Sequence, residues 1–75
     1  MYYVYLIKNL TTNNTYIGYT SDLKRRIKEH KHKNIEIIYY EAYKNEKDAR
    51  EREKKLKQRG QTVRRLKERL KNSLK

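Results

Sequence analysis

The chain has 75 residues, of which 21 are Lys or Arg and 9 are Asp or Glu, so its formal net charge is +12. A chain of this length can close one small core at most, and without Cys it has neither a disulfide nor a thiolate metal site to support that core. No apolar run is long enough to cross a membrane or has the character of a signal peptide. We therefore expect a cytoplasmic protein that does not engage the membrane.

The positive charge is concentrated in the second part of the chain. Residues 44–75 hold 14 basic and 5 acidic side chains, a net charge of +9, whereas all eight Tyr precede them. A basic cluster of this kind attracts polyanions, because each neutralised phosphate releases condensed counterions. Nucleic acid is therefore the expected partner, and a solvated surface that serves solubility is the alternative interpretation.

The first half of the chain predicts a β-hairpin, a helix and a third strand. Residues 2–8 (YYVYLIK) and 15–20 (TYIGYT) are rich in aromatic and β-branched side chains and flank a turn-forming stretch. A helix is expected over about 22–32, with Ser21 as its N-cap. The apolar run 35–43 (IEIIYYEAY) then predicts a strand in the centre of a small sheet.

Two helices complete the predicted fold. Asn45 is expected to cap the first, which would end at Gly60 with a left-handed residue. The second is expected over about 62–73, as a basic helix with an apolar stripe and a frayed end. The order ββαβαα, without Pro or a linker, predicts a single α+β domain over residues 1–75.

Some polar residues of the helices do not fit a packing role. In the helix that follows Asn45, an acidic residue, Glu53, shares the inward stripe with the apolar residues on either side of it. An inward carboxylate costs several kcal/mol unless it is paired or binds a cation, so we expect either an Arg or Tyr partner or a metal ion. Arg26 and His30, four residues apart, share one face of the preceding helix.

The predicted hairpin combines tyrosines with one glycine. Strand alternation places Tyr3, Tyr5 and Ile7 on one face of the first strand. Gly18 follows Tyr16 by two residues and removes a side chain from the face to which Tyr16 points, which would let a backbone or a ligand approach closely. The alternative for each tyrosine is a half-buried strand residue with its hydroxyl in water.

Together these residues resemble the motifs of the GIY-YIG nuclease family. The matching positions, in chain order, are the tripeptides 3–5 (YVY) and 16–18 (YIG), then Arg26, His30 and Glu53. The resemblance covers roughly residues 2–70 and is closest to short stand-alone bacterial members. It implies a small three-stranded antiparallel sheet flanked by helices, and metal-dependent cleavage of nucleic-acid phosphodiesters.

The resemblance also implies a role for each matched residue. Tyr5 would deprotonate or orient the attacking water, and Tyr16 would hold the water or phosphate opposite it. Arg26 would grip the scissile phosphate, Glu53 would hold the metal ion, and His30 would lie near the nucleophile. A single carboxylate suits Mg²⁺, with Mn²⁺ as a substitute, because Mg²⁺ keeps several waters and accepts phosphate oxygens.

A tyrosine base has a consequence for the pH dependence of cleavage. A free phenol loses its proton at about pH 10, so it is a weak base at neutral pH. We expect the cleavage rate to rise into the alkaline range. A plateau already reached at about pH 6 in a rate–pH profile would argue against Tyr5 as the base.

Contacts to the nucleic-acid backbone are expected from basic side chains of the helices. These are Lys24, Arg25, Lys57, Arg64 and Lys67. We expect DNA rather than RNA as substrate, a monomeric protein, and targeting by a partner protein or by DNA structure. Two alternatives stay open: a nucleic-acid-binding module that has lost efficient turnover through its short loop at 31–34, and a basic protein whose Leu66/Leu70 helix packs on another subunit.

Overall fold

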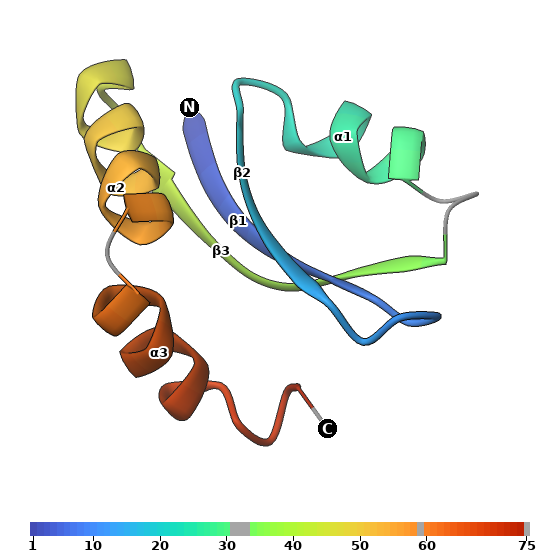
Figure 1. Cartoon of the computed structure of the whole chain (residues 1–75). Coiled ribbons are helices and arrows are strands. Elements are labelled where there is room, and N and C mark those ends of the chain that lie inside the picture. The colour runs from blue at the N-terminus through green and yellow to red at the C-terminus, as the bar shows by residue number, and fades with distance from the viewer. Residues whose placement is uncertain (31–33, 59, 75) are drawn as a thin grey trace.

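The computed structural model of the chain describes residues 1–30, 34–58 and 60–74. Its elements, in chain order, are β1 (Tyr2–Asn9), β2 (Thr15–Thr20), α1 (Leu23–His30), β3 (Ile35–Tyr43), α2 (Glu46–Gln58) and α3 (Gly60–Arg69). The strands form one antiparallel sheet in the order β2-β1-β3, with α1 on one face and α2 and α3 on the other (Figure 1). The predicted α+β fold with the order ββαβαα is confirmed.

The central strand of the sheet is β1, so the prediction that residues 35–43 form the centre was wrong. β1 pairs with β2 on one side and with β3 on the other. Its middle residues 4–7 are all buried, since helices cover both faces of the sheet at this strand. In β3 the apolar residues are half-buried and alternate with exposed ones, because an edge strand leaves its tyrosines partly in solvent.

The hydrophobic core lies between the sheet and the pair α2 and α3. It contains the buried side chains of Val4, Ala49, Leu56 and Leu66, with Leu70 packed against them. Leu66 and Leu70 thus pack within the chain itself. The apolar stripe of α3 is used by this core, which removes the basis for proposing that the stripe binds another subunit.

The caps of α1 and α2 follow from short polar side chains. Asp22 caps α1, because its Oδ1 accepts a hydrogen bond from the Arg25 amide at 3.1 Å. The predicted cap, Ser21, lies one residue too early. Asn45 caps α2 as predicted, and its Oδ1 accepts from the Lys47 amide at 2.8 Å.

The end of α2 and the bounds of α3 differ from the prediction. Gly60 has no positive φ and is the first residue of α3, so it is not the left-handed residue that ends α2. α3 ends at Arg69 instead of about residue 73, because the Leu70 amide already shares its hydrogen bond with the carbonyls of Leu66 and Lys67. The end of the helix predicted over 22–32 and most of the loop at 31–34 lie outside the described residues.

Candidate active site

Tyr5 and Gly18 lie opposite each other in the register of β1 and β2. A Cβ atom on Gly18 would overlap the Cζ and the hydroxyl oxygen of Tyr5, so the phenol occupies the space that a side chain at position 18 would fill. The Tyr5 side chain is only 5% exposed. A close approach at Gly18 is present as expected, but the approaching group is the Tyr5 phenol instead of a backbone or a ligand. The phenol is thereby held in place.

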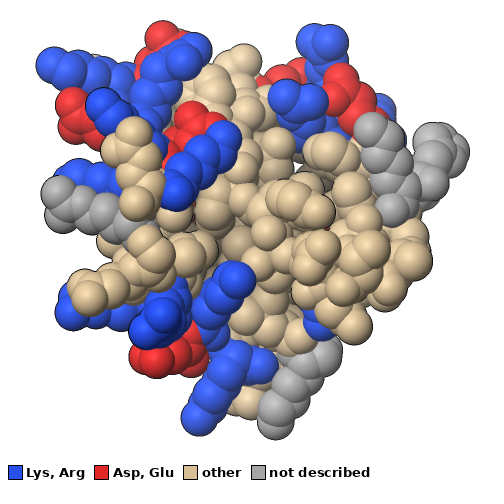
Figure 2. Space-filling model, in the orientation of Figure 1, with Lys and Arg blue, Asp and Glu red and all other residues tan. Residues whose placement is uncertain are grey.

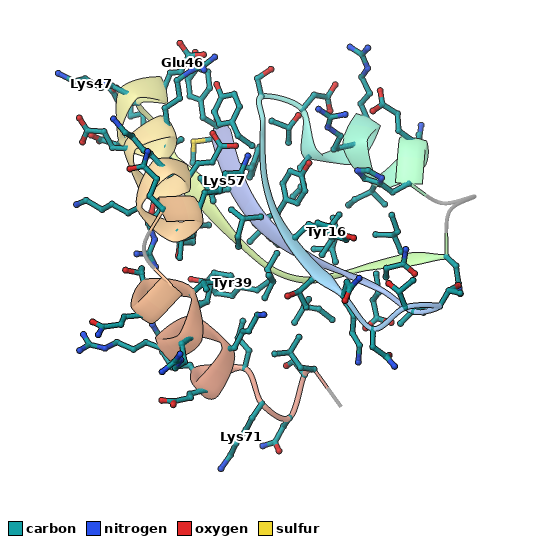
Figure 3. All side chains as sticks on the ribbon, in the orientation of Figure 1. Tyr16, Tyr39, Glu46, Lys47, Lys57 and Lys71 are labelled. Carbon is teal, nitrogen blue, oxygen red and sulfur yellow. The ribbon has the colours of Figure 1, made fainter. Side chains whose placement is uncertain are left out.

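Tyr16 presents the second phenol of the predicted site. It lies opposite Ile7 and, two residues before Gly18, on the same face of the sheet. Its side chain is 52% exposed, and Figure 3 shows it on the middle of the hairpin. A fixed, buried phenol and an accessible one therefore share the sheet face that α1 covers.

Arg26 lies on α1 beside this face. It lines a hollow of about 180 Å³ together with Thr20 at the end of β2. Its Nη1 lies 3.0 Å from a carboxylate oxygen of Glu29, and the Nε of Arg25 lies 3.1 Å from the other oxygen. Exposed ion pairs contribute only about 0–1 kcal/mol, so Arg26 can exchange this carboxylate for a phosphate at little cost.

His30 closes α1 with an unsatisfied nitrogen. Its Nδ1 is buried and makes no hydrogen bond within the described part of the chain. A buried polar atom without a partner costs about 1–3 kcal/mol. The place of His30 near the nucleophile stays a prediction.

Glu53 comes from α2, in the opposite layer. Its side chain is 21% exposed, and its Oε2 lies 3.1 Å from the Nζ of Lys57, one turn further along the helix. The Glu53 side chain therefore points inward as expected, but it is only half-buried. No charged side chain among the described residues is fully buried. The partner is an exposed Lys instead of an Arg or Tyr.

The stripe of α2 that contains Glu53 faces β2. Glu46, Arg50, Glu53 and Lys57 recur at helical spacing. At the start of this stripe, a Glu46 oxygen accepts from the Tyr19 hydroxyl at 2.7 Å, and the Arg50 guanidinium lies 4.7 Å from the centre of the Tyr19 ring. Because Tyr19 belongs to β2, the whole stripe lies on the β2 side of α2.

The level of Glu53 along β2 follows from helix and strand geometry. β2 lies between α1 and α2 and runs antiparallel to α2 (Figure 1). From Glu46 to Glu53 the helix advances about 10 Å, and a strand covers the same distance in about three residues. By this count Glu53 is expected near the level of Tyr16 but on the opposite face of the sheet. The structure divides the predicted residues between the two faces, Tyr5, Tyr16 and Arg26 on the side of α1 and Glu53 on the side of α2 (Figure 1). No hydrogen bond or ion pair joins the two sets within the described residues.

The acidic and histidine side chains of the described residues show what kind of metal ion the site could hold. Within the described residues, no group of three or more His, Asp or Glu lies close enough together to hold a metal ion by itself. A single carboxylate such as the half-buried Glu53 would suit only an ion such as Mg²⁺, which takes most of its ligands from water and phosphate.

Basic side chains form two rims around the β2 edge. Figure 2 shows Lys and Arg over α2 and α3 on one side and over α1 on the other, with uncharged residues between. The predicted backbone-binding residues are divided between the rims: Lys24 and Arg25 on α1, Lys57 on α2, Arg64 and Lys67 on α3. All are exposed except Lys67, which is half-buried.

Glu41, in β3, is a charged residue that the sequence pattern did not single out. Its carboxylate accepts from Arg52 Nε at 3.0 Å and Nη2 at 3.1 Å, from the Tyr39 hydroxyl at 2.8 Å, and from the Tyr43 hydroxyl. Burial acts to raise the pKa of Glu41, but these hydrogen bonds outweigh it and hold the pKa below its ordinary value. The network ties β3 to α2 at the residue before Glu53. The alternating Tyr-x-Glu-x-Tyr pattern was its sequence signal.

This network predicts an acid-sensitive contribution to stability. Since the pKa of Glu41 is lowered on folding, its contribution is present above the unfolded pKa and is lost as the pH falls through the folded one. We expect Glu41→Gln to lower the free energy of unfolding by about 2 kcal/mol at pH 7 and to reduce its acid dependence. Urea unfolding at several pH values measures both. Glu36→Gln, at an exposed position of the same strand, is the control; equal behaviour of the two variants would contradict the role of Glu41.

The fold defines a class of protein: a small α+β domain with a three-stranded antiparallel sheet between helices, with Tyr5 and Tyr16 on one face of that sheet. Residues 1–68 match the GIY-YIG catalytic domain. The chain belongs to this family of nucleases, and nucleic acid is the substrate class that the family implies. Comparison with curated proteins and with solved structures gives no match. Within the described residues, no helix is both long and apolar enough to span a membrane.

Proposed function

We propose that the protein is a divalent-metal-dependent endonuclease that hydrolyses phosphodiester bonds of DNA. The observation that carries the proposal is the arrangement at the β2 edge. The buried Tyr5 and the accessible Tyr16 share the sheet face on which Arg26 and α1 lie, and the half-buried Glu53 comes from α2 on the opposite face. This edge is uncharged and lies between two basic rims (Figure 2).

Glu53 is the proposed ligand of the ion, Mg²⁺ or Mn²⁺. To bind it, Glu53 must release Lys57, and an exposed pair of this spacing on a helix contributes only about 0.3–0.5 kcal/mol. When bound, the ion would activate water and neutralise charge on the phosphate. Lys57, once released, is free to contact a neighbouring phosphate of the same strand.

The tyrosines and Arg26 act on water and phosphate directly in this proposal. Tyr5, fixed over Gly18, orients the attacking water, and in its phenolate form it accepts a proton from that water and becomes a neutral phenol, while Tyr16 holds the water or phosphate from the accessible side. Arg26 exchanges Glu29 for two phosphate oxygens, since a planar guanidinium matches them with two parallel hydrogen bonds. His30 Nδ1, which has no partner among the described residues, would bond to a water near the nucleophile.

The proposed substrate preference is DNA over RNA, with little sequence selectivity. Contacts between basic side chains and phosphates carry no direct sequence information, so the basic rims support binding to the nucleic-acid backbone with little sequence selectivity. We also propose that the protein acts as a monomer in the cytoplasm, and that a partner protein or the structure of the DNA supplies targeting.

A cleavage assay tests the proposed function. Labelled single- and double-stranded DNA and RNA are incubated with the purified protein in Mg²⁺, Mn²⁺ or EDTA. We expect cutting of DNA with either ion and none with EDTA. Binding without metal-dependent cutting would instead select the nucleic-acid-binding module, and the absence of binding at low salt would exclude both functions.

A further inference from the structure

A hollow of about 440 Å³ lies between the β1–β2 turn and the C-terminal end of α3. Its lining residues are Lys8, Asn13, Asn14, Thr15, Tyr16, Lys67 and Leu74. None of them is acidic, and two are lysines from different elements, β1 and α3. Tyr16 borders this hollow and also belongs to the candidate active site, so the two are continuous at this side chain.

The two lysines bring positive charge to the hollow. Among the described residues, neither Lys8 nor Lys67 forms an ion pair; the Nζ of Lys8 donates to the carbonyl oxygen of Leu74 at 2.5 Å. A phosphate oxygen carries negative charge, whereas the Leu74 carbonyl oxygen is neutral, so an entering phosphate would compete with this carbonyl for the Lys8 ammonium. The hollow at Arg26 differs, because Asp22 and Glu29 line it as well.

The β1–β2 turn adds uncharged donors to the hollow. The backbone amide of Asn13 bonds to the Asn9 carbonyl at 2.7 Å, and that of Asn14 bonds to the Thr12 hydroxyl at 3.3 Å. These bonds fix the turn, with Asn13 at φ 62°, a conformation that Asn tolerates well. The side-chain amides of Asn13 and Asn14 make no hydrogen bond within the described part of the chain, so both remain available to a ligand.

We propose that this hollow is a second phosphate site, which binds the terminal or internucleotide phosphate next to the one at Tyr16. The inference rests on the proposed nuclease function and extends it. A volume of about 440 Å³ accommodates one nucleotide unit, not a duplex. Lys8 and Lys67 hold the phosphate, and the two Asn amides bond to its oxygens or to the sugar. The site fixes the direction in which one strand crosses the β2 edge.

Short ligands that differ by one terminal phosphate test the proposal. The dinucleotide TpT has a single phosphate, and pTpT and TpTp add one at either end. We measure their dissociation constants by NMR titration of the labelled protein in EDTA, where no cleavage occurs. We expect either pTpT or TpTp to bind about tenfold more tightly than TpT and to change the NMR chemical shifts of the backbone amides of residues 13–16. Equal affinity of all three ligands would overturn the proposal.

Variants of the two lysines test whether they cause the tighter binding of the ligand with the additional phosphate. Lys8→Ala and Lys67→Ala should each remove most of the advantage of the additional phosphate while changing TpT binding little. Lys8→Arg should retain it, because the charge is kept. The control is Lys47→Ala, at an exposed residue that Figure 3 shows pointing away from the sheet, and it should behave as wild type. If Lys8→Ala and Lys67→Ala also behave as wild type, the site is wrong.

The second phosphate site and the nuclease function fail in different ways. If the protein does not cut DNA but the lysine-dependent preference is present, the proposed function is wrong and the phosphate site stands. If the protein cuts DNA with Mg²⁺ but neither terminal phosphate improves binding, the phosphate site is wrong and the function stands.

Discussion

Glu53→Gln is expected to abolish metal-supported cleavage while DNA binding stays close to that of the wild type. Gln has the shape of Glu but lacks the negative charge that a divalent cation requires from its single protein ligand. We expect the cleavage rate to fall about 100-fold or more. Single-turnover cleavage with saturating protein measures this loss, and fluorescence anisotropy with labelled DNA measures binding separately.

The control for this variant lies on the same helix. Glu51 is exposed and is two residues from Glu53, so Glu51→Gln removes the same charge from α2 at a position away from the site. Both variants should change the free energy of unfolding by less than about 0.5 kcal/mol, because the half-buried Glu53 pairs only with the exposed Lys57 one helical turn away, and such helix pairs contribute little. Unchanged cleavage by Glu53→Gln would exclude its role as the metal ligand.

Gly18→Ala is expected to damage both stability and activity. The new methyl group would overlap the end of the Tyr5 ring, which is buried and has no solvent to move into. Overpacking of this kind costs about 1–3 kcal/mol. The displaced phenol can no longer orient water as proposed, so the cleavage rate of the folded variant should also fall. Urea unfolding and cleavage assays below the unfolding transition measure the two effects separately.

Gly60→Ala is the matched control, since no atom lies within 4 Å of its added Cβ and its φ is not positive. Gly60→Ala, at the start of α3, should leave the cleavage rate unchanged. It should raise the free energy of unfolding by up to about 1 kcal/mol, because Ala has a higher helix propensity than Gly. If Gly18→Ala were as stable and as active as the wild type, Tyr5 would not depend on the space above Gly18.

The elements of the fold could be predicted because their signals are local. β-branched and aromatic runs marked the strands, and Asn45 marked the start of α2 through its own hydrogen bond. The place of β3 in the sheet could not be predicted in the same way. Which strand becomes central depends on the packing of helices on both faces, and this is decided by residues far away in sequence.

In the candidate site, too, the features that could be predicted are those with local sequence signals. The contact of Tyr5 with Gly18 follows from strand alternation and hairpin register, both short-range properties. The depth of Glu53 depends on where α2 lies over the sheet, and its position on the flank of the apolar stripe leaves it beside Lys57 at the β2 edge. Lys8 has no signal in the sequence at all, because α3 and residues near 74 complete its hollow.

The most direct test is a crystal structure of the protein with Mn²⁺ and a phosphorothioate oligonucleotide, which resists cleavage. We predict an anomalous Mn²⁺ peak at about 2.0–2.2 Å from a Glu53 carboxylate oxygen. Tyr16 and Arg26 should contact the same phosphate from the other side of the β2 edge. A structure in which the oligonucleotide and Mn²⁺ bind elsewhere, with Glu53 still paired to Lys57, would contradict the proposed site.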